Sequence, residues 1–150
     1  MNDTHARILS DLASQVGHYE QLLKLASRQR DLIAGDRADE LLILLGERET
    51  VIAKMNLLDQ RLRPVRAEWA SVSGSLDAEV RQQAQAMFEK LRDLLGKITS
   101  SDADDALVLQ QKKLDVRKQI NATGQQLQVT RHYAADAYAS QAKSNLNIIR

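Results

Sequence analysis

Apolar residues recur at steps of mostly three and four along the chain, with polar and charged residues at the positions between them. A stripe with this period is typical of an amphipathic α-helix that buries one face. The first two stripes are Ile8, Leu12, Val16, Tyr19, Leu22, Leu23, Ala26 and Ile33, then Leu41, Leu44, Leu45, Ile52, Met55, Leu58 and Leu62. The next two are Leu76, Val80, Ala84, Met87, Phe88, Leu91, Leu95 and Ile98, then Leu107, Leu109, Leu114, Val116, Ile120 and Leu127. The pattern predicts an all-α chain.

The first break in the pattern falls at Gly35 and Asp36, between two leucine-rich stretches. Gly35 suits the residue after a helix, which often adopts the left-handed conformation. Asp36 suits the cap of the next helix, with Asp39 in its first turn. We therefore expect two helices that fold back as an αα-hairpin. The alternative is one continuous helix with an exposed glycine.

Three later features predict further boundaries. Pro64 lacks an N–H, so the second helix should end or kink near Arg63, although another helical turn or two can follow. Ser75 suits the cap of a third helix, after a loop that contains Gly74. In the run TSSDADD, Asp102 is a good N-cap and is followed by another aspartate three residues later, an arrangement close to a capping box.

The predicted architecture is therefore an elongated antiparallel helical bundle, or a coiled-coil hairpin, of three to four long helices. We expect one helical domain over residues 1–150, with helices at about 3–33, 37–63, 76–99 and 103–138 and a tail at 139–150. An extension of the second helix to residue 70 stays open. Two interpretations of the last ten residues also stay open, namely a partner-binding surface and a frayed tail.

Composition and charge exclude several classes of protein. The chain has 21 Lys and Arg against 20 Asp and Glu, a net charge of +1, which gives no electrostatic reason to expect nucleic acid or an anionic membrane as partner. It has no cysteine, which excludes a disulfide framework and a thiolate metal site. No apolar run approaches the roughly 20 residues that span a bilayer, and the first 15 residues are charged throughout. We therefore expect a cytoplasmic protein without membrane insertion.

No catalytic or metal motif has the spacing that its chemistry requires. His132 and Asp136 are four residues apart, but no third ligand is obvious, so a surface hydrogen bond is the better interpretation. The DADD run has Ala106 where a calcium loop needs its third ligand. Gly96 and Lys97 lack the upstream glycine and the following Ser or Thr of a phosphate loop. We expect no enzyme activity, no metal and no cofactor.

One stretch resembles a known family. Residues 19–62, YEQLLKLASRQRDLIAGDRADELLILLGERETVIAKMNLLDQRL, look like the first hairpin of the flagellar export chaperones of the FlgN type. The residues that carry the resemblance are Leu22, Leu23, Arg30, Leu32, Gly35, Asp36, Leu41, Leu44, Arg48, Ile52, Leu58 and Leu62. Residues 112–128, KKLDVRKQINATGQQLQ, are similar to the family's third long helix. The chain departs from the family where Gln29 and Arg30 replace a glutamate before the turn, and where Arg48 replaces a lysine.

The resemblance implies a cytosolic chaperone that works without ATP. Such proteins hold the C-terminal amphipathic segments of hook–filament junction subunits, prevent premature assembly, and deliver these clients to the export gate of the flagellar type III secretion apparatus. In this family the C-terminal helical half binds the client, and a C-terminal tyrosine contributes to docking on the export gate. By position, the partner-binding residues expected from the resemblance are Ile120, Leu127, Val129, Tyr133 and Tyr138. Packing within the chain's own core is an equally good interpretation of the first two, and either tyrosine could be the docking residue.

Two other functions stay open at this point. A structural coiled-coil protein would bury its stripes in a homodimer or a larger scaffold. A helical enzyme with a carboxylate site would need a pocket with converging acids.

Overall fold

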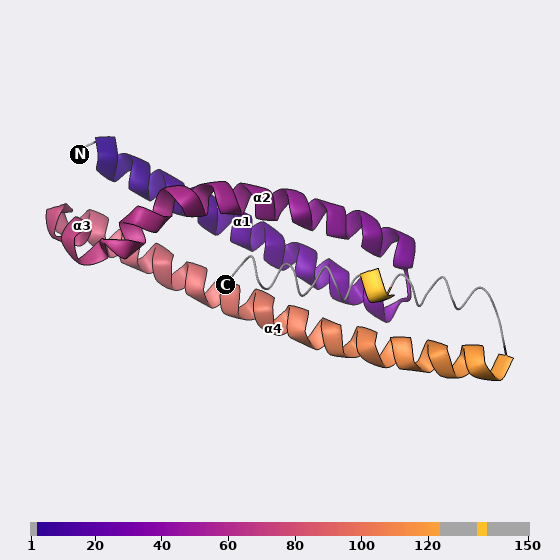
Figure 1. Cartoon of the computed structure of the whole chain (residues 1–150). Coiled ribbons are helices and arrows are strands. Elements are labelled where there is room, and N and C mark those ends of the chain that lie inside the picture. The colour runs from indigo at the N-terminus through magenta and orange to yellow at the C-terminus, as the bar shows by residue number, and fades with distance from the viewer. Residues whose placement is uncertain (1–2, 124–134, 138–150) are drawn as a thin grey trace.

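A computed structural model describes residues 3–123 and 135–137 of the chain. Its helices are α1 (Asp3–Ala34), α2 (Ala38–Ala67), the short α3 (Trp69–Ser75) and α4 (Ala78–Thr123). Figure 1 shows that α2 runs back along α1 and that α4 runs back again, so that α1 and α4 point the same way. The predicted all-α fold of long antiparallel helices is confirmed. None of the helices in these two ranges combines the length and apolar character needed to cross a bilayer.

Two apolar clusters hold the helices together. The larger cluster lies toward the α1–α2 turn and contains Leu22, Leu25, Leu32, Ile33, Leu41, Leu44, Leu45, Val51, Ile52, Met55, Ile98, Leu109 and Ala135. The smaller cluster lies toward α3 and joins buried Ile8, Leu12, Leu62 and Ala84 to half-buried side chains that include Trp69 and Phe88. Most members come from the predicted stripes, because burial of one apolar face is what keeps an amphipathic helix in place.

The predicted hairpin between the first two helices is confirmed, but its turn differs from the expectation. The residue with a left-handed backbone is Asp36, with φ of 55°, and not Gly35. Gly35 instead continues the helical hydrogen bonding, because its N–H donates to the Asp31 carbonyl at 3.0 Å. Asp36 is not the N-cap of α2 either. That position belongs to Arg37, which makes no side-chain cap hydrogen bond.

The chain after the hairpin also departs from two predicted boundaries. Pro64 lies inside α2, which continues to Ala67, so the helix does not end near Arg63 and the open extension toward residue 70 is realised in part. The break falls at Glu68, between α2 and α3. Ser75 ends α3 and is not the N-cap of the next helix, which begins at Ala78. At this start the Arg81 N–H donates to the Asp77 carbonyl at 2.9 Å.

The predicted break between residues 99 and 103 does not exist. Helix α4 runs through TSSDADD without interruption over 46 residues, about 70 Å. Its buried stripe continues across this run at helical spacing: Leu94, Ile98, Asp102, Asp105 and Leu109. The two aspartates therefore occupy core positions and cap no helix. The break had also placed Leu107 and Leu114 in the following stripe, and both are exposed.

Candidate functional site

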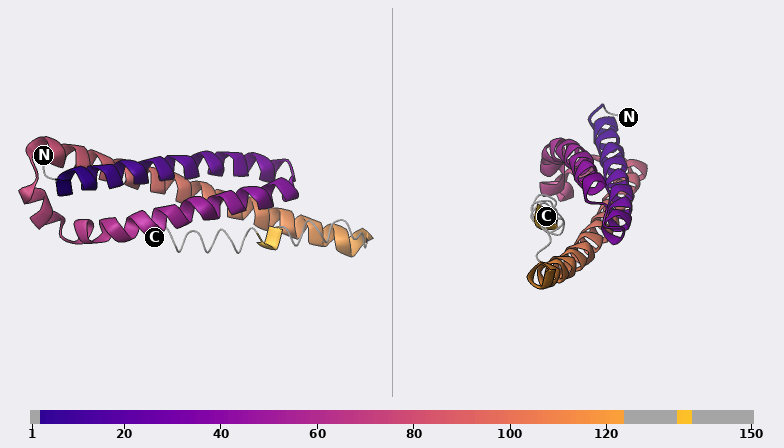
Figure 2. Two further views of the ribbon diagram at one scale, coloured as in Figure 1. Left: turned by 90° about the horizontal axis from the view of Figure 1, so that it is seen from above. Right: turned by 90° about the vertical axis from the view of Figure 1, so that its right-hand side faces the viewer.

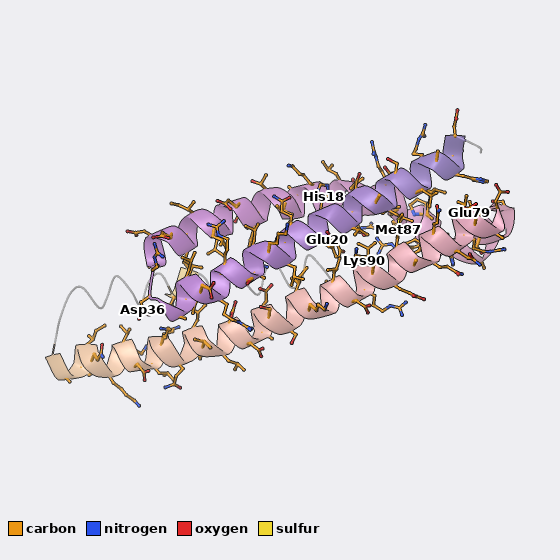
Figure 3. All side chains as sticks on the ribbon, turned by 180° about the vertical axis from the view of Figure 1, so that it is seen from behind. His18, Glu20, Asp36, Glu79, Met87 and Lys90 are labelled. Carbon is orange, nitrogen blue, oxygen red and sulfur yellow. The ribbon has the colours of Figure 1, made fainter. Side chains whose placement is uncertain are left out.

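The candidate site depends on the position of α1, which lies between α2 and α4 and contacts both. Helix α1 packs along both α2 and α4, whereas α2 and α4 hardly contact each other. The end-on view in Figure 2 shows the three long helices at the corners of an open triangle. Lys90 of α4 and Glu20 of α1, labelled in Figure 3, form one of the ion pairs along the α1–α4 seam, at 3.0 Å. Two clefts lined by residues of α1, α2 and α4 lie between the outer helices, one near the hairpin and one toward α3, and we call the space that they form the groove.

The chain's own residues 135–137 lie over the end of this groove that is near the hairpin. Ala135 is buried in the larger apolar cluster, which includes Leu32, Leu41 and Leu109. The carboxylate of Asp136 forms an ion pair with Lys113 of α4. Helices α1, α2 and α4 thus accept helical residues between α2 and α4, as a four-helix bundle would.

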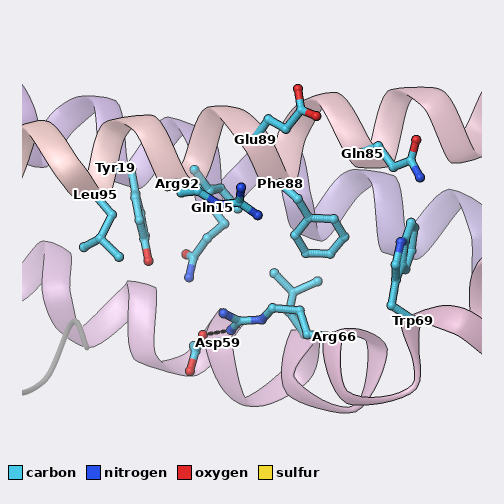
Figure 4. Close-up of a pocket in the computed structure, with 12 residues that line it drawn as sticks. Gln15, Tyr19, Asp59, Arg66, Trp69, Gln85, Phe88, Glu89, Arg92 and Leu95 are labelled. Atoms are coloured by element: carbon cyan, nitrogen blue, oxygen red, sulfur yellow. Dashed lines mark hydrogen bonds and ion pairs between the residues drawn. The ribbon is translucent and has the colours of Figure 1, made fainter.

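Further along the groove, toward α3, lies a cleft of about 560 Å³. The residues around it are Gln15, Tyr19, Asp59, Leu62, Arg66, Trp69, Gln85, Phe88, Glu89, Leu91, Arg92 and Leu95. They come from all four helices, as the close-up in Figure 4 shows. We call this the α3-end cleft. Its lining mixes aromatic and aliphatic side chains with a few polar groups, which is the usual character of a binding surface.

Gln15 is the least expected residue in the α3-end cleft. Its side chain is 2% exposed, and it follows Leu12 and precedes Tyr19 in the apolar stripe of α1. Its Nε2 donates to the Met55 carbonyl at 3.0 Å, whereas its Oε1 has no hydrogen-bond partner among the described residues. A buried acceptor without a donor costs about 1–3 kcal/mol. This acceptor is closed off from solvent, so a ligand could reach it only if the Gln15 side chain turned toward the cleft.

An aromatic pair closes the end of the cleft near α3. Trp69 of α3 and Phe88 of α4 lie edge to face, with ring centroids 5.2 Å apart and an angle of 73° between the planes. This arrangement is favourable for the ring quadrupoles. Both rings are only half-buried, so they offer apolar area to anything that lies in the cleft.

The charges on the rim of the cleft are mixed. Arg66 and Asp59, both of α2, form an ion pair, and Glu89 and Arg92 stand on the α4 side. Burial raises the pKa of the Tyr19 phenol, an effect that the positive charge of Arg66 partly opposes, so the hydroxyl stays protonated at neutral pH. The floor of the cleft is thus neutral between two charged edges, which suits an amphipathic helix better than a strongly charged ligand.

A second polar feature lies under the larger apolar cluster and fixes α4 to the hairpin. Arg48 is 1% exposed and binds both oxygens of Asp102, at 2.8 and 2.7 Å. The same guanidinium donates to the Gln29 Oε1 at 2.6 Å, and the Gln29 Nε2 donates to Asp105 at 2.9 Å. Arg30 approaches Asp105 from the exposed side, at 3.5 Å. We call this set the buried polar network.

The buried polar network is built for holding helices together. Its two carboxylates are closed off from solvent, and Asp102 is satisfied by a bidentate guanidinium, which is the strongest form of this contact. Burial raises the pKa of Asp105, while hydrogen bonds from Gln29 and Arg30 act in the opposite direction. In the described part of the chain, no group of three or more His, Cys, Asp or Glu side chains is placed to hold a metal ion.

The binding residues expected from the resemblance are not in the α3-end cleft. Ile120 is half-buried near the far end of α4, about seven turns beyond Leu95. The remaining four, Leu127, Val129, Tyr133 and Tyr138, lie outside the described residues, as does His132.

Sequence reasoning missed the cleft itself. Tyr19 and Phe88 stood in the predicted stripes as ordinary core residues, although the structure leaves both half-exposed at a gap between helices. Gln15 carried the one usable signal, because an amide at a core position of an amphipathic helix needs a partner.

Comparisons with known proteins give no assignment. No protein-family model, no curated protein and no solved structure matches the chain.

Proposed function

We propose that this protein is a helix-binding chaperone of the flagellar export type that its sequence resembles. It covers the C-terminal amphipathic helix of a hook–filament junction subunit in the cytosol, keeps the subunit from assembling early, and delivers it to the export gate. It does this by binding alone, without catalysis, metal or cofactor. The client occupies the groove between α2 and α4.

The observation that carries the proposal is the open floor of α1 in the α3-end cleft. Beside the α3-end cleft the described part of the chain supplies three long helices, and these bury less apolar surface than a complete four-helix bundle. A client helix with an apolar stripe would complete the bundle by packing on Trp69 and Phe88. This is recognition of a helix in a groove, in which the apolar face gives most of the affinity.

The proposal also assigns roles to residues outside the cleft. Ile120, Leu127 and Val129 extend the client-binding surface along the C-terminal half of the chain, and Tyr133 or Tyr138 docks on the export gate protein. These assignments rest on the resemblance of residues 19–62 and 112–128 to the chaperone family.

The test is a titration of the full-length protein with a labelled synthetic peptide, followed by fluorescence anisotropy. The peptide spans the C-terminal helix of a hook–filament junction subunit. We expect binding, and we expect Phe88→Ala and Arg92→Ala each to weaken it roughly tenfold or more, because both side chains line the cleft. Leu107→Ala is the control, because Leu107 lies on α4 but is 71% exposed and does not line the cleft.

Arg92 is exposed, so its replacement tests the cleft without the risk of unfolding that accompanies Phe88→Ala. A melting curve for each variant separates lost binding from lost folding. The proposal fails if the wild-type protein does not bind the peptide, or if both cleft variants bind it as tightly as the control does.

A further inference from the structure

The outer face of α2 carries two large apolar side chains that no described residue of the chain covers. Ile43 and Leu57 are each 66% exposed. They lie 14 residues apart, so they stand on the same side of the helix, and this side is opposite the buried positions such as Leu44, Leu45 and Met55. Exposed apolar residues are ordinary when scattered singly, but a pair in helical register suggests a contact surface.

The positions between these two side chains complete a regular seam. Gly46, Thr50 and Ala53 follow at steps of three and four, and all are exposed. A Cβ atom added at Gly46 would meet nothing within 4 Å, so the helix surface is open at this point. We call these five residues, Ile43, Gly46, Thr50, Ala53 and Leu57, the α2 outer seam. Steps of three and four with apolar ends and small residues between them fit close packing against another helix.

The charges beside the seam decide which helix fits. Glu40, Glu47, Lys54 and Arg61 follow one another at steps of seven, so they form a single flank of the α2 outer seam. The flank is acidic toward the start of α2 and basic toward its end. A helix that matches this flank must be basic where α2 is acidic and acidic where α2 is basic. Helix α2 itself, turned end to end, meets this requirement.

We propose that a second copy of this chain docks on the α2 outer seam, α2 against α2 and antiparallel, about a two-fold axis near Thr50 and Val51. In this register Glu47 faces Lys54 of the second copy and Glu40 faces Arg61 of the second copy, and symmetry repeats each contact. Leu57 packs over Gly46 of the second copy, so that a large side chain meets the smallest one. The proposal does not depend on the proposed chaperone function.

The ion pairs that these side chains make within one chain do not prevent the contact. Glu40 pairs with Arg37, Glu47 with Arg28 at 3.5 Å, and Arg61 with Asp11 at 3.3 Å. In each pair the flank residue is exposed, and such pairs contribute little to stability and can be shared or exchanged.

The length of the seam sets the strength of the contact. The 14 steps from Ile43 to Leu57 span about 21 Å of helix, which is short for a stable dimer. We therefore expect a dimer that exchanges with the monomer at micromolar concentration, and that leaves the α3-end cleft of each copy open.

The first test measures the dissociation constant of the full-length protein by sedimentation velocity, over about 1 to 300 µM. Wild-type protein should form dimers in this range. Glu47→Lys and Lys54→Glu should each weaken dimerisation roughly tenfold, because each turns two attractive contacts into repulsive ones. The double variant carrying both changes should regain wild-type dimerisation, because the charges are then exchanged but remain complementary.

All four charged residues of the flank are exposed, so these changes should leave the helical circular dichroism signal and the melting temperature nearly unchanged. The proposal is overturned if the wild-type protein stays monomeric at the highest concentration, or if the double variant is as weak as the single ones.

The second test distinguishes antiparallel from parallel pairing. The chain has no cysteine, so a single introduced thiol is a clean probe. In the antiparallel register two copies of Ala53→Cys are offset by only about 8 Å along the axis, whereas two copies of Ile43→Cys are offset by about 22 Å. A short bis-maleimide should therefore cross-link the first variant and not the second. Cross-linking of both variants, or of neither, would contradict the proposed orientation.

Discussion

At the scale of single residues, the most unusual feature is an arginine in the core. Arg48 is held by Asp102 through two hydrogen bonds and by Gln29 through a third, but its Nε has no partner in the described part of the chain. Burying two charges costs as much as their attraction returns, so such a pair adds little stability by itself. Its effect is on specificity, because a buried charge that loses its partner is strongly destabilising.

Asp102→Ala should therefore lower the free energy of unfolding by about 3 to 5 kcal/mol, because it leaves the Arg48 guanidinium buried and unpaired. Arg48→Met combined with Asp102→Leu should recover most of this loss, because the charge and its partner are removed together. Urea denaturation followed by circular dichroism measures both variants.

The matched control for this prediction is Asp104→Ala, two residues further along α4. Asp104 is mostly exposed and pairs with Arg30 at 3.6 Å, so its loss should cost less than about 1 kcal/mol. If Asp102→Ala and Asp104→Ala lower the free energy of unfolding equally, the buried Arg48–Asp102 pair is no more important for stability than a surface pair.

Asp105 gives a prediction about pH. Burial raises its pKa above the ordinary value of an aspartate, so the folded state binds its proton more tightly than the unfolded state does. Protonation of Asp105 therefore contributes its full stabilisation when the pH is below the pKa of an unfolded aspartate. This stabilisation is lost as the pH rises through the higher pKa of the folded state. Asp105→Asn cannot ionise, so its stability relative to wild type should increase as pH rises from about 4 to about 7. Urea titrations at the two pH values test this, and a difference that does not change with pH would contradict it.

At the scale of the helices, the residue with a strained backbone conformation in the turn between α1 and α2 is not the one expected. Asp36 holds the left-handed backbone, and its carboxylate accepts a hydrogen bond from the Lys112 ammonium group of α4 at 2.7 Å. Gly35 has no such conformation, and a Cβ atom placed on it would meet its nearest neighbour, the Asp31 carbonyl oxygen, at 3.4 Å, an ordinary contact.

Gly35→Ala should therefore stabilise the protein by a few tenths to about 1 kcal/mol, because alanine restricts the unfolded chain more than glycine does. The sequence alone suggests the opposite, since it places the left-handed residue at Gly35. The melting temperature of Gly35→Ala decides whether the alanine stabilises or destabilises the protein. A clear decrease would show that Gly35, and not Asp36, is the residue that needs a conformation unfavourable for alanine.

How far the fold could be predicted from the sequence differs from one helix to the next. Steps of three and four among apolar residues were enough to predict α1 and α2, because burial of one face is the main requirement on a long helix. The run TSSDADD misled because serine and aspartate favour helix starts when nothing else is known. What keeps α4 helical there is contact with Gln29 and Arg48, residues more than 50 positions away in the chain.

The candidate site could be predicted even less well, for a related reason. Its residues come from α1, α2, α3 and α4, and the feature that they share is a gap between α2 and α4. An apolar stripe indicates that a residue is turned inward, but it does not indicate whether another helix covers it. Tyr19 and Phe88 were therefore predicted to be core residues, although they border the α3-end cleft.

At the scale of the whole molecule, the two proposed contact surfaces use different sides of α2. Leu62 and Arg66 line the α3-end cleft, whereas Ile43 and Leu57 point away from the core. Dimerisation through the α2 outer seam would leave both clefts accessible, one on each copy. Client binding and self-association can then be measured separately, since a variant of one surface leaves the other unchanged.

The buried polar network has a consequence for how α4 can move. A helix packed only through leucines can slide along its neighbour by one turn, about 5.4 Å, and find nearly equivalent contacts. A slide of α4 by one turn would take Asp102 away from the guanidinium of Arg48, the one buried arginine in the described part of the chain. The two walls of the groove are thereby held in alignment, and a helix that bound there as proposed would meet a template whose spacing is already set.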